Sequence, residues 1–195
     1  MSSTAILETP PDLSLIQPAD IILTASESRG SMGIRGSTCS PFSHAILALE
    51  DGDCIDAMPG DGVRLRFLSD VLKTASHAVL YRHIYMTPEY AAYVCHFAMM
   101  QKNKEYDYFG AARSGISSGC GNGLPAKLPL FREVVIIHDS TQKRKHNNKF
   151  FCSELIVSSF DKADIPLLDI PAHAATPGAI ATSNKLKIIK ELIPA

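Results

Sequence analysis

The sequence of 195 residues contains no tryptophan, and its formal net charge is only −1. Its phenylalanines and tyrosines are spread along the chain, so no aromatic cluster is available on which nucleic-acid bases could stack. An excess of basic residues, which nucleic-acid-binding proteins usually carry, is also missing. We therefore expect no nucleic-acid partner.

Long hydrophobic runs are absent as well. No stretch approaches the roughly 18 apolar residues that a membrane-spanning helix needs. The first 20 residues lack a basic segment ahead of an apolar core and include Glu8, Asp12 and three prolines. We therefore expect no cleavable secretory signal. The protein would then be cytoplasmic in the cell that makes it, or would leave through a secretion system that needs no such signal.

The cysteines and histidines lack the spacing of a metal site. The five cysteines include no CxxC pair, and the seven histidines include no HxxxH pair. Neither a zinc site nor a metalloenzyme is predicted. The odd number of cysteines argues against a disulfide framework, and reduced thiols are the default without an export signal. Phosphate-binding and dinucleotide-binding fingerprints are missing too, so we predict no cofactor.

What is present is the composition of one globular domain. Hydrophobic residues make up 46% of the chain and charged residues 20%, and a chain of this length can bury one sizeable core. Residues 1–18 show little periodicity and are expected to form an N-terminal arm ahead of a single domain at 19–195. Two stretches rich in glycine and serine, 26–42 and 112–123, are expected to be loops.

Short apolar runs separated by turn residues predict a sheet of consecutive strands. These strands are expected at residues 19–24, 43–49, 54–57, 63–67 and 78–84. Helices are expected at 87–101, where Thr87 caps and Pro88 opens the first turn, and at 151–163. The final run, 185–193, fits a strand and a helix equally well.

Cys152 is the sharpest candidate for chemistry. It lies in the segment KFFCSEL, where a short aromatic strand meets a predicted helix. The unpaired N–H groups of a first helical turn, together with the helix dipole, lower the pKa of a thiol there and favour the thiolate. The same N–H groups can bind a developing oxyanion. The alternative is a cysteine buried in the core, which is the commoner fate of a single cysteine.

His44 and Asp56 could complete a catalytic group with Cys152. His44 begins an otherwise apolar strand, and a strand would hold its imidazole rigidly beside a thiol. Asp56 follows across a predicted hairpin, so its carboxylate could accept a hydrogen bond from the ring and fix its tautomer. The alternatives are a hydrogen-bonded structural histidine and a solvent-exposed aspartate beside a turn.

The order of several short segments resembles that of the circularly permuted papain-like amidases: DIIL, SHAILAL, CIDA, YDY, FFCSEL and TPGAIA. These amidases are relatives of the NlpC-type cell-wall peptidases and, more distantly, of lecithin retinol acyltransferase. In the usual order the cysteine precedes the histidine, whereas in the permuted order the histidine comes first, as here. The resemblance spans residues 20–193, nearly the whole chain.

This resemblance implies an α+β fold of the permuted papain-like type, with the Cys152 helix packed against an antiparallel sheet of five or six strands. It implies Cys152 as the nucleophile, His44 as its base and Asp56 as the orienting acid, although the family often has Glu at the last position. Further residues near the substrate or the oxyanion would be Ser43, Tyr106, Tyr108 and Ser153.

Three functions follow as hypotheses. The first is a cysteine amidase or endopeptidase that cleaves peptidoglycan stem peptides, which could act as an antibacterial toxin delivered by a contact-dependent secretion system. The second is a hydrolase or acyltransferase of lipids or N-acyl amides. The third is a binding module that kept the fold without catalysis. The expected partner is a peptide or acyl-amide substrate, and an immunity or secretion partner is left open.

Overall fold

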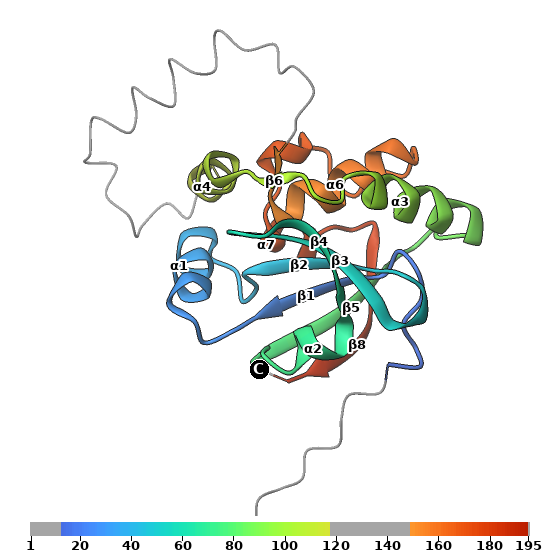
Figure 1. Ribbon diagram of the computed structural model, residues 1–195, viewed down its shortest axis with the longest axis horizontal. Coiled ribbons are helices and arrows are strands. Elements are labelled where there is room, and N and C mark those ends of the chain that lie inside the picture. The colour runs from blue at the N-terminus through green and yellow to red at the C-terminus, as the bar shows by residue number, and fades with distance from the viewer. Residues whose placement is uncertain (1–12, 118–148, 195) are drawn as a thin grey trace, which may run out of the picture.

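Residues 13–117 and 149–194 are described by the computed structural model of the protein. They form a six-stranded antiparallel sheet with helices on both faces (Figure 1). The predicted α+β class and the predicted number of strands are therefore confirmed. The permuted papain-like type is a finer assignment, and it is taken up with the function below.

The sheet runs in the order β4-β3-β2-β1-β5-β8. Its strands are β1 (Ile21–Ala25), β2 (His44–Ala48), β3 (Asp53–Met58), β4 (Gly62–Phe67), β5 (His77–His83) and β8 (Leu186–Ile193). The run that fitted both a strand and a helix is thus the edge strand β8. A separate two-stranded parallel sheet joins β6 (Glu105–Tyr106) to β7 (Lys149–Phe150).

The helices lie unequally on the two faces of the sheet (Figure 1). The larger ones, α3 (Pro88–Met100) and α6 (Cys152–Lys162), cover one face, and the short α2 (Leu68–Leu72) packs on the other. The smaller elements are α1 (Arg29–Thr38), α4 (Tyr108–Ser117), α7 (Pro177–Ala181) and the 3-10 turns Glu50–Gly52 and Ala172–Ala174. None of the helices in the described ranges is long and apolar enough to cross a bilayer.

Alternate residues of each strand feed two separate cores, as expected where both faces of a sheet are covered. Leu23 and Leu47 point to the face where Leu155 of α6 packs. Ile22 and Ile46 point to the opposite face, where Leu68 of α2 packs. The last part of the predicted arm also packs on this second core, through Leu13 and Ile16. The domain boundary at residue 18 stays a prediction.

The stretch 26–42, predicted as a loop, contains the helix α1 instead. Its glycines are tolerated because the helix start is well anchored: Ser28 caps it by accepting the N–H of Ser31. The Ser31 hydroxyl is buried and lies 2.6 Å from that of Ser43. The stretch 112–123 is also only partly as predicted, since residues 112–117 belong to α4. Its remainder lies outside the described residues.

Candidate active site

Cys152 is the first residue of α6, where that helix meets the sheet. No side chain caps the helix start: Phe151 occupies the capping position with an extended backbone and makes no side-chain capping bond. The N–H groups of the first turn are therefore not used by a capping residue. The thiol is almost buried, with the residue 7% exposed, and it faces both a cavity and β2.

β2 contributes two groups to the thiol. The His44 side chain and the backbone N–H of Ala45 both hydrogen-bond to Cys152. β2 pairs with β3 only at Leu47 and Ala48, so the two strands have separated before Ala45 is reached. The separation leaves this end of β2 open to the start of α6.

Asp56 of β3 holds the other side of the His44 ring. Its Oδ2 lies 2.9 Å from Nε2 of His44, which leaves Nδ1 as the ring nitrogen that can serve Cys152. The aspartate side chain is fully buried. The structure thus brings together the three residues that the sequence singles out, in the order thiol, imidazole, carboxylate.

The surroundings move the pKa values of this group in favour of the charged forms. Burial alone would raise the pKa of the Cys152 thiol, but the hydrogen bond and the positive charge of His44 outweigh it, and the thiol pKa is lowered. Burial would lower the pKa of His44, but Asp56 and Cys152 together raise it. The pKa of Asp56 is lowered because His44 and two arginines overcome its burial. The arrangement favours a thiolate–imidazolium pair.

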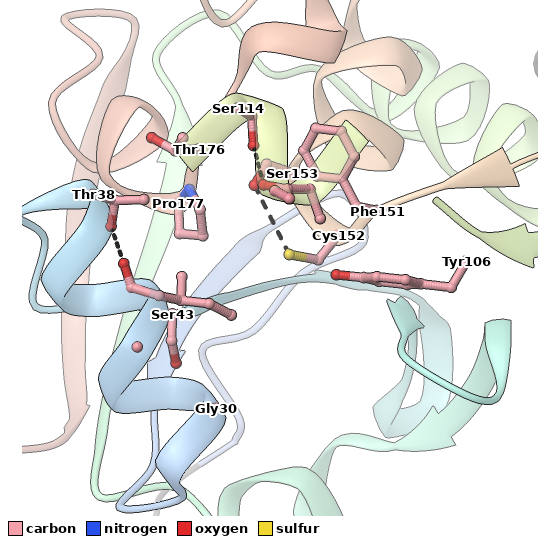
Figure 2. Close-up of a pocket in the computed structure, with 14 residues that line it drawn as sticks. Gly30, Thr38, Ser43, Tyr106, Ser114, Phe151, Cys152, Ser153, Thr176 and Pro177 are labelled. Atoms are coloured by element: carbon pink, nitrogen blue, oxygen red, sulfur yellow. Dashed lines mark hydrogen bonds between the residues drawn. The ribbon is translucent and has the colours of Figure 1, made fainter. Parts of the chain in front are cut away.

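A cavity of about 270 Å³ opens beside the sulfur (Figure 2). Gly30 and Gly33 of α1 form one wall, and a Cβ atom added to either would meet no atom within 4 Å. Ala111 and Ala112 of α4 line it further. Apart from the Cys152 sulfur itself, no charged side chain of the described residues lines this cavity.

Three of the four further predicted residues line this cavity, namely Ser43, Tyr106 and Ser153. The Ser153 hydroxyl lies 3.8 Å from the sulfur. Figure 2 shows the Tyr106 hydroxyl directed toward Cys152, and burial together with the nearby thiolate raises the pKa of this tyrosine. Tyr106 is therefore held as a neutral hydrogen-bond donor.

Tyr108 does not line the cavity. Its hydroxyl accepts a hydrogen bond of 2.7 Å from the N–H of Gly60, and its ring packs against Tyr106 with centroids 5.0 Å apart. It therefore ties the β3–β4 turn to the start of α4. Its predicted place beside the substrate stays a prediction.

Sequence reasoning missed two arginines beside Asp56. Arg64 Nε lies 3.4 Å from Oδ1, and Arg66 Nη1 lies 3.5 Å from Oδ2. The alternation in VRLRF predicts a half-exposed strand and shows both arginines on one face. The alternation does not show that this face of β4 contacts Asp56. That contact depends on the strand register, in which Asp56 pairs with Arg64.

One expectation about the cysteines is wrong. Cys39 is disulfide-bonded, whereas Cys54, Cys95 and Cys152 are free thiols. An odd number of cysteines excludes complete pairing but not a single bridge. Cys39 ends α1 in a left-handed conformation with φ of 47°.

A solved structure with the same fold is that of the metalloprotein yiiX (DUF1105) from Escherichia coli O157:H7. The two share 15% identity and superpose with a TM-score of 0.62 over 91% of this chain and 98% of that one. Among the residues described here, no group of three or more His, Cys, Asp or Glu side chains could hold a metal ion. Asp56 is already bound by His44 and by arginines, so the residues of this site do not fit a metal centre.

No model of a known protein family matches the chain. Its sequence is 27% identical over 176 residues to the probable lipoprotein peptidase YaeF of Escherichia coli strain K12. The match covers 82% of this chain but 59% of YaeF, so the chain spans less than two thirds of that relative. The protein is thus similar in sequence to a peptidase, and it shares the α+β fold of yiiX.

Proposed function

We propose that the protein is a cysteine hydrolase of the permuted papain-like type that cleaves amide bonds in peptides. The observation that carries this proposal is the His44 ring, which bonds to the Cys152 thiol on one side and to the buried Asp56 carboxylate on the other. The cysteine follows the histidine in the chain, as the permuted order requires. The similarity to a peptidase over 82% of the chain supports the same reaction class.

The arrangement of these residues supports a two-stage acyl transfer. The Cys152 thiolate attacks the amide carbonyl carbon, and the carbonyl oxygen becomes an oxyanion. The N–H groups at the start of α6, which have no side-chain cap, are the proposed donors to that oxyanion, and the Tyr106 hydroxyl is a further proposed donor. The C–N bond then breaks as His44 gives its proton to the leaving amine. Water, deprotonated by His44, attacks the thioester and releases the acid, which restores the thiolate–imidazolium pair.

The substrate class that fits best is an uncharged peptide segment with small side chains, such as the alanine-containing part of a peptidoglycan stem peptide. The cavity beside Cys152 adjoins a second one of about 440 Å³, and Thr38 and Thr176 line both. No charged side chain of the described residues lines the second cavity either. Residues of an extended peptide on either side of the cleaved bond could occupy these two neighbouring cavities.

Mass spectrometry of purified muropeptides after incubation with the protein tests this proposal. We expect hydrolysis of a stem-peptide amide bond by the unmodified protein and none by Cys152→Ala. The matched control is Cys95→Ala, which removes another free thiol, on α3, and should leave hydrolysis unchanged. Equal activity of Cys152→Ala and the unmodified protein would contradict the mechanism.

A cell-wall substrate lies outside the cytoplasm, so the proposal includes delivery to it, by a secretion system that needs no cleaved signal or by another route. Expression in Escherichia coli behind an added export signal tests this part. Lysis should occur with the unmodified protein and not with Cys152→Ala, and absence of lysis in both would count against a toxin.

A second candidate function is hydrolysis of N-acyl amides. It is favoured by the largely apolar wall of the cavity at Cys152, to which Ile34 and Phe151 contribute. A series of N-acyl amino acids of increasing acyl length separates the two functions. Turnover that rises with acyl length and is absent for stem peptides would favour this candidate. A catalytically silent binding module would show neither turnover nor selective labelling of Cys152 by a thiol-reactive probe.

A further inference from the structure

Two arginines of β4 surround the carboxylate that orients His44. Asp56 pairs with Arg64 across the β3–β4 ladder, and Cys54 pairs with Arg66. Because alternate residues of a strand share a face, Arg64 and Arg66 both extend toward Asp56. The side chain of Asp56 has no exposed surface, whereas those of Arg64 and Arg66 are 30% and 25% exposed.

A buried carboxylate needs a cationic partner at every stage of a reaction. His44 can be that partner only while it is protonated, and it gives its proton to the leaving group in the proposed reaction. At the thioester stage a neutral imidazole would leave the Asp56 charge buried with no cation, which is a costly state. Guanidinium groups do not lose their proton in proteins, so the two arginines remain as partners when His44 is neutral.

Resting on the proposed function, we propose that Arg64 and Arg66 are positioning residues that keep Asp56 ionised throughout the catalytic cycle. An ionised Asp56 accepts the Nε2–H of His44 in both protonation states of the ring. Proton exchange with Cys152, the leaving amine and water is then confined to Nδ1. The arginines touch neither the sulfur nor the cavity that opens beside it, so they act through Asp56 and His44.

The two arginines are not equivalent. Arg64 also binds Asp61 in the β3–β4 turn, so its loss disturbs that turn as well. Arg66 has Asp56 as its single ion-pair partner in the described part of the chain. Other titratable groups near the carboxylate are Cys54 on the same face of β3, whose pKa burial raises to about 12, and the Cys152–His44 pair itself. Arg66 is therefore the sharper position to change.

The sign of the expected pH effect follows from charge. Without Arg66, Asp56 takes up a proton at a higher pH than before, and the imidazolium of His44 then loses its partner. The loss of the imidazolium raises the pH below which the thiolate is lost.

The rate of Cys152 alkylation by iodoacetamide, measured against pH, tests the inference without any substrate. For Arg66→Met we expect the acid limb of the profile to move up by about one pH unit, with a larger move in the Arg64→Met/Arg66→Met double variant. Arg66→Lys, which restores the charge, should move back toward the unmodified protein.

Arg82→Met is the matched control. Arg82 binds the buried Asp20 on the same sheet, with Nε 2.6 Å from Oδ1, but this pair does not contact His44 or Cys152. Arg82→Met should lower the melting temperature without shifting the pH profile of Cys152 alkylation. An unmoved profile in Arg66→Met, or an equal shift in Arg82→Met, would overturn the inference. If the unmodified Cys152 itself alkylates like an ordinary thiol, the proposed function fails first, so the two failures are distinguishable.

Discussion

Cys152 and Cys95 are both thiols on helices that pack against the same face of the sheet, yet their surroundings act on them in opposite directions. Burial raises the pKa of Cys95 to about 11, and its sulfur donates to the carbonyl of Ala48. Burial acts on Cys152 as well, but His44 reverses the effect and lowers the thiol pKa. Cys54, which has the carboxylate of Asp56 nearby instead of an imidazolium, follows Cys95 with a pKa raised to about 12.

The difference teaches that burial keeps the pKa of a thiol high unless a hydrogen-bonded imidazolium outweighs it. The arginines near Cys54 lower its pKa but do not overcome its burial. Cys54 is buried like Cys152, and Cys95 is partly buried, so burial cannot distinguish the reactive cysteine. What distinguishes Cys152 is the imidazole of His44, which is itself held in its charged form by Asp56. The difference between Cys152 and the other two thiols therefore depends on two contacts, Cys152 with His44 and His44 with Asp56. Each contact can be removed by a separate substitution.

Removing the carboxylate should have the largest effect. Asp56→Asn leaves the shape of the side chain nearly unchanged but removes the charge that supports the imidazolium. We expect hydrolysis to fall on the order of 10³- to 10⁴-fold, with circular dichroism showing a retained fold. Activity within a factor of a few of the unmodified protein would show that Asp56 does not orient His44, although the Cys152–His44 pair could survive.

Removing the imidazole should turn Cys152 into a thiol like Cys95. In His44→Ala, burial is no longer opposed, so the rate of Cys152 alkylation at pH 7 should fall roughly 10- to 100-fold. Peptide mass spectrometry of labelled protein measures both sites at once. The labelling rate of Cys95 serves as the internal control and should not change. Equal loss at both cysteines would point to a general change of structure.

The smallest expected effect concerns a second histidine, which extends the comparison. His83 is buried, its Nδ1 accepts the N–H of Tyr85, and burial together with Lys185 lowers its pKa below the usual 6.5. Because its pKa in the folded protein lies below that in the unfolded chain, the unfolded chain binds more protons as pH falls through 6.5, and stability is lost in that direction. His83→Gln should therefore reduce the loss of stability between pH 7.5 and pH 5 in urea unfolding. An unchanged pH dependence would contradict the assignment.

Most residues of the candidate site could be predicted from the sequence, whereas fewer features of the surrounding fold could. The SHAILAL strand and the helix opening at Cys152 were recognisable because apolar periodicity and cap position are local properties. The contact of Asp56 with His44 followed from a hairpin, which is nearly local. Their catalytic roles, and those of Tyr106 and Ser153, stay predictions.

The parts that could not be predicted depend on contacts between distant segments. Helix α1 has poor helix-forming composition, and its start is anchored by the Ser31 hydroxyl against Ser43. The arginines beside Asp56 required the register of β3 and β4. The place of Tyr108 at the β3–β4 turn required its bond to Gly60, which is 48 residues away in the chain. None of these contacts leaves a local pattern in the sequence.

The central claim is that Cys152 is a thiolate at neutral pH because of His44, and the labelling rates of the three free cysteines in the unmodified protein test it most directly. Brief treatment with iodoacetamide at several pH values, read by peptide mass spectrometry, gives a rate for Cys54, Cys95 and Cys152. We predict that Cys152 reacts fastest and keeps its rate at pH values below the ordinary thiol pKa of about 8.5, whereas the other two react only well above that value. Faster labelling of Cys54 or Cys95, or a rate at Cys152 that follows an ordinary thiol pKa, would contradict the account.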